Sequence, residues 1–89
     1  MEPFAARRDR LRELMAEAGC DALLVTDLCD VRYLCGFSGS NAALLVLTDG
    51  EVLATDGRYR VHAAREAPDV EGLITRKLAC DLLGEARDR

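Results

Sequence analysis

The fold is decided by residues 42–55, which read AALLVLTDGEVLAT. Two runs with a strand pattern, 42–47 and 51–55, flank the pair Asp49-Gly50. An Asp-Gly pair between two such runs is a strong signal for a tight turn between antiparallel strands. We therefore expect a β-hairpin over this stretch.

A helix and a strand are expected upstream of the hairpin. Apolar residues at helical spacing predict a helix over residues 3–18, which Gly19 can end in a left-handed conformation. The Arg and Glu residues between them, including Arg8 and Arg12, fit a solvated face held by pairs one turn apart. The short apolar run 22–25 favours a strand buried on both faces beneath covering helices.

A short helix is expected between this strand and the hairpin. Either Asp27 or Asp30 can cap its first turn, and Gly36 can end it. Residues 38–41, Ser-Gly-Ser-Asn, are typical of a turn. Loop residues therefore gather immediately before the first strand of the hairpin.

Downstream of the hairpin, Asp56-Gly57 predicts a turn into a helix near residues 58–67. Pro68 stops that helix, a strand can follow within 70–75, and leucines from residue 78 mark a last helix with no evident packing partner. The whole pattern predicts an α/β fold, in which a mixed β-sheet with an antiparallel hairpin is flanked by helices. We expect one domain over residues 1–89.

Composition narrows the class of protein. The chain is 49% hydrophobic and 31% charged, which is typical of a folded globular domain. Its net charge is −4 with basic and acidic residues interspersed, so we expect no nucleic-acid partner. The apolar stretches are too short to span a bilayer and the N-terminus is too charged for a signal peptide, which favours the cytosol and no membrane partner.

The four cysteines, Cys20, Cys29, Cys35 and Cys80, contain no C-x-x-C pair. Their spacing therefore favours neither a zinc knuckle nor a thioredoxin-type redox site. We expect four free thiols that act mostly as small hydrophobic residues in a reducing compartment.

The sequence gives little support for a catalytic site. His62 is the only histidine, which leaves a hydrolytic metal centre without its usual ligands, so we expect no metal site in this chain. Residues 36–39 begin like the nucleophile elbow G-x-S-x-G, but Ser40 stands where glycine is required. No glycine pattern for a dinucleotide or triphosphate is present.

Two loops combine polar and aromatic residues, one running from Arg32 to Asn41 and the other covering residues 56–59. Their side chains either close the core and cap helices, or face a common cleft that clamps a peptide or a partner surface. The sequence leaves both interpretations open. The candidate binding residues are Arg32, Tyr33, Phe37, Ser38, Ser40, Asn41, Asp56, Arg58 and Tyr59.

Residues 30–42, DVRYLCGFSGSNA, together with the hairpin and residues 54–59, ATDGRY, resemble the amino-terminal domain of Xaa-Pro aminopeptidases, prolidases and creatinase. The resemblance covers about residues 7–75 and is greatest to aminopeptidase P and bacterial prolidase. Asp30 and Cys35 depart from the usual pattern, in which Asn and Thr are frequent.

The resemblance implies a larger metallopeptidase, whose carboxy-terminal pita-bread domain binds two divalent metals, often manganese or cobalt, and hydrolyses the bond preceding proline. It implies that the family's amino-terminal domain continues beyond residue 89. In such a parent this domain catalyses nothing itself, forms homodimer contacts, and controls access of a proline-containing peptide to the partner's active site. The candidate residues would then bind substrate or partner and none would be catalytic.

Two alternatives stay open. The parent can be a creatinase-like amidinohydrolase, whose amino-terminal domain is similar. The chain can also be a stand-alone protein-interaction module that keeps the fold without the enzyme.

Overall fold

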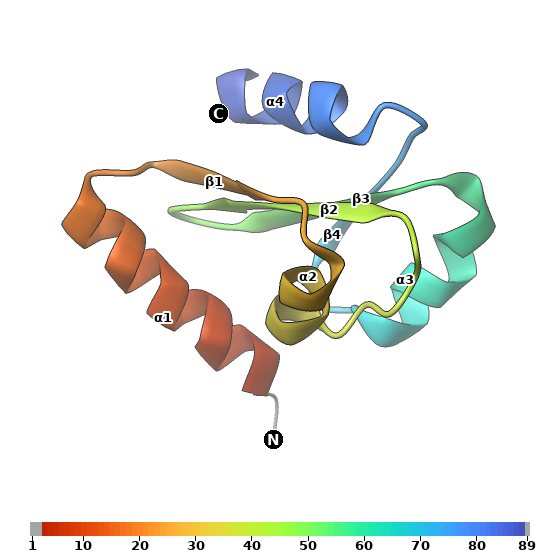
Figure 1. The fold of residues 1–89 in the computed structure, drawn as a ribbon, viewed down its shortest axis with the longest axis horizontal. Helices are drawn as coiled ribbons and strands as arrows, with labels where there is room; N and C mark the ends of the chain where they lie inside the picture. Colours follow the sequence, from red (N-terminus) through yellow and green to blue (C-terminus); the bar gives the residue numbers. More distant parts are fainter. Residues whose placement is uncertain (1–2, 89) are drawn as a thin grey trace.

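The structure is a computed structural model that describes residues 3–88. Helices and strands follow one another in the order shown in Figure 1. They are α1 (Pro3–Ala18), β1 (Ala22–Val25), α2 (Leu28–Cys35), β2 (Ala42–Leu47), β3 (Glu51–Thr55), the 3₁₀ turn η1 (Gly57–Tyr59), α3 (Arg60–Glu66), β4 (Glu71–Ile74) and α4 (Leu78–Asp88). Among residues 3–88, no helix has the length and apolar character that a membrane span requires.

The four strands form one mixed sheet in the order β1-β2-β3-β4. β2 pairs antiparallel with β3, with Leu44 opposite Leu53, and the Leu47 N–H donates to the Gly50 carbonyl at 2.8 Å across the turn. β1 is antiparallel to β2, whereas β4 is parallel to β3 and is reached through η1 and α3. The predicted hairpin and the mixed α/β class are therefore confirmed.

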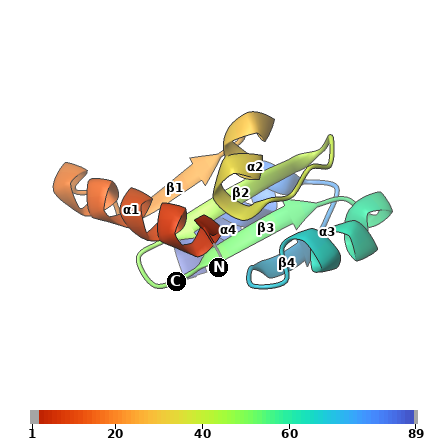
Figure 2. The same cartoon turned by 90° about the horizontal axis from the view of Figure 1, so that it is seen from below.

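Helices cover both faces of the sheet. In Figure 1, α1, α2 and α3 lie below the sheet and α4 lies above it, and Figure 2 shows the three lower helices in front of the strands. Leu44 and Val46 of β2 belong to the core on the side of the three lower helices, whereas Leu45 packs in a second cluster with Leu82 of α4. Alternate side chains of a strand point to opposite faces, so burial on both sides explains the unbroken apolar run 42–47.

The last helix has a packing partner that its sequence alone did not reveal. Leu82 is fully buried against the upper face of the sheet, and Leu78 and Ala86 pack beside it. These positions recur every four residues, so they line one side of α4. This amphipathic stripe holds the helix on β2 and β3.

The burial predicted for β1 is wrong. Ala22 is exposed and the other three residues, 23–25, are only partly buried. β1 is an edge strand that pairs with β2 alone, so its outer side has no neighbouring strand. The strand that is buried on both faces is β2.

The ends of α2 follow the turn chemistry of the sequence. Asp27, one of the two candidates, is the N-cap, and its carboxylate accepts hydrogen bonds from the N–H groups of Cys29 and Asp30. Gly36 ends the helix with φ of 86°, in the left-handed region that glycine adopts without strain. A Cβ at this position would lie 2.9 Å from the Phe4 ring, so the close approach of α1 also requires glycine.

The prediction of a fully solvated charged face on α1 is wrong at Arg8. This side chain is only 3% exposed and pairs with the carboxylates of Glu51 and Asp69, while it donates a 2.9 Å hydrogen bond to the Leu34 carbonyl. Burial alone would lower the pKa of the guanidinium, but Asp69 and Glu51 outweigh it and raise the pKa. Arg8 thus joins α1, the end of α2 and the sheet.

Arg12 also departs from that prediction. It keeps one expected local pair, with Asp9, but also donates to the carbonyls of Leu47 and Gly50 at 2.7 Å each. These two carbonyls flank the hairpin turn, so α1 holds the turn as well as the core.

All four cysteines are free thiols in the structure, and only Cys35 is buried. Burial raises the pKa of the Cys35 thiol, which keeps it in its neutral form. Cys20, Cys29 and Cys80 are exposed, so the prediction that the cysteines act mostly as small hydrophobic residues is wrong for these three.

Candidate functional site

The two polar loops of the sequence meet at one end of the β2–β3 pair. Asn41 directly precedes β2 and Asp56 directly follows β3, and the antiparallel register places their neighbours Ala42 and Thr55 opposite each other. The Asn41 amide donates to the Asp56 carboxylate at 2.8 Å, and the Thr55 hydroxyl donates to the Asn41 carbonyl at 2.5 Å. Strand pairing therefore brings together two segments that lie fifteen residues apart.

Asp56 is the most heavily hydrogen-bonded side chain of this site. Its carboxylate accepts from the backbone N–H of Arg58 and from two nitrogens of the same guanidinium, at 2.9 to 3.0 Å. These bonds from Arg58, followed by the one from Asn41, hold the pKa of Asp56 well below its usual value. Asp56 is thus an ionised clamp between the two loops and also caps η1.

Aromatic rings form a layer behind the polar groups. Phe37 contacts Tyr59 edge-to-face with ring centroids 5.7 Å apart, and His62 lies within 6 Å of both rings. Tyr59 shares a 2.6 Å hydrogen bond with the Ser40 hydroxyl, which lowers the pKa of the phenol. Phe37 is almost completely buried, so it supports the loop from inside.

Gly39 allows the loop to fold over these rings. A Cβ on this residue would lie 2.3 Å from the Phe37 ring and 3.1 Å from Tyr59. The backbone of the loop therefore packs directly on the aromatic layer, which a larger residue would prevent.

Glu66 of α3 anchors the beginning of the same loop, a role that the sequence did not indicate. Its carboxylate accepts from the Ser38 N–H at 2.8 Å and from the Ser38 hydroxyl at 2.9 Å, and it pairs with His62 at 3.2 Å. Burial alone would raise the pKa of Glu66, but the bonds from Ser38 and the contact with His62 lower it overall.

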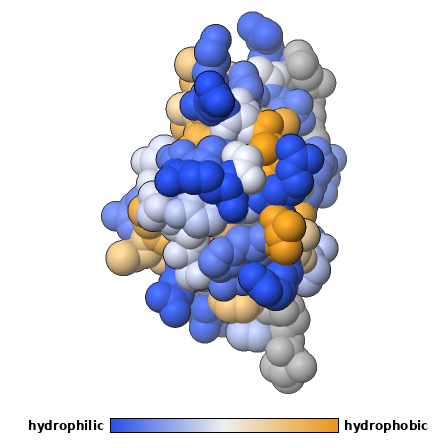
Figure 3. All heavy atoms as spheres, turned by 90° about the vertical axis from the view of Figure 1, so that its right-hand side faces the viewer, coloured by the Kyte–Doolittle hydropathy of each residue, from blue (hydrophilic) through white to orange (hydrophobic). Residues whose placement is uncertain are grey.

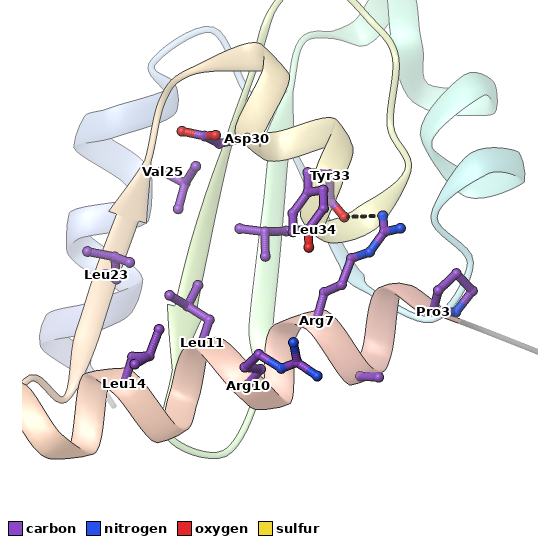
Figure 4. A pocket seen from close by; sticks show the side chains of 11 residues that line it. Pro3, Arg7, Arg10, Leu11, Leu14, Leu23, Val25, Asp30, Tyr33 and Leu34 are labelled. Atoms are coloured by element: carbon purple, nitrogen blue, oxygen red, sulfur yellow. Dashed lines mark hydrogen bonds between the residues drawn. The ribbon is translucent and has the colours of Figure 1, made fainter.

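Seven of the nine candidate residues therefore belong to one connected site, and two do not. Tyr33 lies on α2 and faces α1, where the Arg7 guanidinium carbon is 4.2 Å from its ring centroid. Arg7 also donates to the Tyr33 carbonyl at 3.0 Å, as Figure 4 shows. Arg32 is exposed on the same helix. A role for these two residues in binding stays a prediction from the sequence.

A polar cavity of about 600 Å³ opens beside the Asp56 clamp. It lies where the parallel strands β3 and β4 end, the edge at which α/β sheets generally bind ligands. Figure 3 shows the right-hand side of Figure 1, a largely hydrophilic surface on which the hydrophobic atoms form separate patches. The cavity is lined by Asn41, Asp56, Gly57, Arg58, Ile74, Thr75 and Arg76.

The last three lining residues are absent from the candidates that the sequence predicted. They are the last residue of β4 and the two residues after it, and the position of this parallel strand beside β3 depends on the crossover through α3. The only hint in the sequence is the polar pair Thr75-Arg76 at the end of the predicted strand 70–75.

A second hollow, of about 700 Å³, lies on the side of the edge strand β1. Figure 4 shows its walls, which come from α1, β1 and α2. Apolar side chains dominate it, and Leu14 and Tyr33 remain more than half exposed there. This groove shares no residue with the polar cavity.

The described residues do not fit a metal centre. No group of three or more His, Cys, Asp or Glu side chains converges within residues 3–88. His62 contacts Glu66, and the Asp56 carboxylate accepts hydrogen bonds from Arg58 and Asn41. These groups therefore hold the loops in place.

Comparison with known proteins identifies the family of this chain. The pattern of the creatinase/prolidase N-terminal domain family matches residues 7–87. The chain belongs to this family. The resemblance of residues 30–42 and 54–59 is thereby confirmed, and the match extends beyond the region on which the sequence analysis relied.

Solved structures of creatinase/prolidase N-terminal domains share the fold. The N-terminal domain of cytoplasmic peptidase PepQ from Mycobacterium tuberculosis H37Rv superposes with a TM-score of 0.89 and 57% identity, over 91% of this chain and 64% of that one. An Xaa-Pro aminopeptidase from Streptococcus pyogenes gives a TM-score of 0.82 and 34% identity, over 94% of this chain and 67% of that one.

A curated relative is considerably longer than this creatinase/prolidase N-terminal domain. The uncharacterized peptidase YqhT of Bacillus subtilis is 36% identical over 55 residues, which are 62% of this chain and 16% of that protein. The chain thus spans about a sixth of the length of this relative.

Proposed function

We propose that this chain is the non-catalytic N-terminal domain of a metal-dependent Xaa-Pro peptidase of the aminopeptidase P or prolidase type. In that parent the domain contributes to a homodimer and to substrate access at the partner's active site. The observation that carries the proposal is the connected site at Asp56, where hydrogen bonds fix two loops of the family pattern at the end of the sheet.

The hydroxyl groups of the site support a binding role and not a catalytic one. The Ser38 hydroxyl donates to Glu66, and the Ser40 hydroxyl is bonded to Tyr59. Neither serine bonds the His62 imidazole among the described contacts, and the carboxylate that accepts from Ser38, Glu66, has a lowered pKa, which makes it a weak base for activating a nucleophile. The site offers a rigid polar surface that can contact a peptide.

Chemistry in the parent would come from its carboxy-terminal domain. The Streptococcus pyogenes relative is named an Xaa-Pro aminopeptidase, so we propose hydrolysis of the bond preceding proline for the parent of this chain. Two divalent metals, manganese or cobalt, would be held by that other domain, since residues 3–88 offer no suitable ligand cluster. The PepQ relative is described as cytoplasmic, which supports the same location here.

The proposal is tested in the parent enzyme with Arg58→Ala. Loss of this side chain removes two hydrogen bonds from Asp56 and one cation from the site, so we expect KM for an Xaa-Pro peptide to rise about tenfold. The metal content should stay unchanged, because the metals lie in another domain. Arg65→Ala, an exposed arginine of α3 outside the site, is the matched control.

Sedimentation of the same proteins tests the dimer. An unchanged KM and an unchanged dimer in Arg58→Ala would show that the site has only a structural role. A creatinase-like parent would instead hydrolyse creatine and leave Xaa-Pro peptides intact.

A further inference from the structure

We propose that the polar cavity at the ends of β3 and β4 binds a carboxylate group, held between Arg58 and Arg76. The proposal rests on the function proposed above and assigns one ligand class to the site. Three of its lining residues, Ile74, Thr75 and Arg76, lie outside the candidates that the sequence predicted.

Arg58 is already oriented for such a ligand. Its Nε and one terminal nitrogen bond Asp56 at 3.0 and 2.9 Å, and its guanidinium carbon lies 5.2 Å from the centre of the Tyr59 ring. These contacts fix one edge and one face of the planar group. The other edge still carries N–H donors, and the side chain is 70% exposed, so a ligand can reach them.

Arg76 supplies a positive charge without an internal partner. It follows β4, is exposed, and forms no hydrogen bond or ion pair within the described residues 3–88. Because Asp56 balances Arg58, the charged side chains that line the cavity carry an excess of one positive charge, while the Asp81 carboxylate just outside the lining accepts a hydrogen bond from the Thr75 hydroxyl. The chain as a whole carries −4, which makes this cavity a local exception.

A carboxylate matches this arrangement in charge and shape. It is a monoanion, so it neutralises the single excess charge, and its two oxygens fit the paired donors of a guanidinium. Ile74 adds an apolar contact for the carbon chain beside the carboxylate. Asn41 uses its amide N–H on Asp56, which leaves its side-chain oxygen to accept from a peptide N–H.

The 89-residue chain can be tested directly by NMR titration with three peptides. They are N-acetyl-Ala-Pro-Ala with a free carboxylate, the same peptide as its C-terminal amide, and N-acetyl-Glu-Pro-Ala amide. We expect the first to shift the backbone amides of Gly57, Arg58, Thr75 and Arg76 in a saturable way, and the neutral amide to leave them unchanged. The third peptide shows whether an acidic side chain is accepted as well as a chain terminus.

Two variants connect the shifts to the arginines. Arg76→Gln removes a side chain that forms no hydrogen bond or ion pair within residues 3–88, so the fold should persist while the peptide affinity falls about tenfold. Arg58→Gln should have a similar effect, and Arg65→Gln should have none. Raising the salt concentration should weaken binding, because the arginines are exposed.

Equal shifts with the acid and its neutral amide would overturn the proposal. So would the absence of saturable shifts, or an equal loss of affinity in Arg65→Gln and Arg76→Gln. Each of these results can occur while the parent enzyme still shows the KM change proposed above. A failure of the carboxylate site is therefore distinguishable from a failure of the accessory role.

Discussion

Arg8 shows how much one side chain can organise in a domain of this size. It is almost completely buried, and its two carboxylate partners, Glu51 and Asp69, come from the start of β3 and from the turn before β4. A buried guanidinium loses hydration, which only well-placed partners can offset. This cluster therefore fixes α1 to the sheet through a specific geometry and not only through apolar contact.

Replacing Arg8 should destabilise the domain strongly. Arg8→Ala removes the ion-pair partner of Asp69 and leaves Glu51 with Arg12 alone. Breaking a fully buried pair typically costs about 3–5 kcal/mol, and because Asp69 is partly exposed we expect a loss near the lower end of that range. Urea unfolding followed by circular dichroism measures this change. Arg65→Ala on the exposed side of α3 should change stability by less than about 0.5 kcal/mol. Similar values for the two variants would contradict the role of the cluster.

Glu66 makes the loop before β2 sensitive to acid. Its pKa is lowered in the folded state, so its contribution to stability is present above its ordinary value of 4.5 and is lost as the pH falls through the folded pKa. Wild-type protein should therefore lose more stability between about pH 5 and pH 3 than Glu66→Gln does.

Urea unfolding across this pH range is the measurement, and Ser38→Ala is the intermediate case because it removes one of the donors to Glu66. We expect its pH dependence to fall between those of the wild type and Glu66→Gln. Identical pH profiles for all three proteins would show that the Glu66 carboxylate does not hold the loop.

At the scale of elements, the upper layer of the fold depends on one helix. α4 is the helix that covers the upper face of the sheet, and Leu82 is its fully buried residue. Leu83 is its neighbour in the chain but is 57% exposed. Leu82 and Leu83 thus allow a comparison between two residues of the same type that differ in burial.

Leu82→Ala should cost about 2–5 kcal/mol, because it removes buried methyl groups and leaves a cavity between α4 and the sheet. Leu83→Ala should cost less than about 1 kcal/mol. Thermal or urea unfolding of the two variants gives the comparison directly. Equal losses would mean that α4 is not docked on the strands as described.

Local sequence was sufficient for most of these elements. The Asp-Gly turn and the stop at Gly36 each act within a few residues, so the bounds of the hairpin and the end of α2 could be predicted, whereas the N-cap of α2 stayed open between Asp27 and Asp30. The burial of Arg8 and the edge position of β1 could not, because both depend on residues or strands far along the chain.

The candidate site also contains residues that local sequence could predict and residues that it could not. Asn41 and Asp56 were predicted from the two loops, and the hairpin register explains why they meet. Glu66 and Arg76 were missed, since neither lies in a distinctive motif and each reaches the site through the crossover that places α3 and β4. Tyr33 was predicted to be a binding residue because it lies in the family motif, whereas in the structure its ring faces α1.

At the scale of the whole molecule, the surface at the ends of β3 and β4 differs from the surface along the edge strand β1. The end that carries Asp56 has polar, prearranged groups, whereas the hollow along β1 is apolar and open. Among residues 3–88, no group of three or more His, Cys, Asp or Glu side chains could hold a metal ion. This division agrees with the accessory role proposed above.

Hydrolysis of an Xaa-Pro peptide with added manganese tests this account most directly, when it is measured on the 89-residue chain and on its full-length parent. We predict that the parent releases the residue before proline and that the 89-residue chain stays at the level of a control with manganese alone. Turnover by the short chain above that control, or a parent that leaves Xaa-Pro peptides intact, would contradict the account.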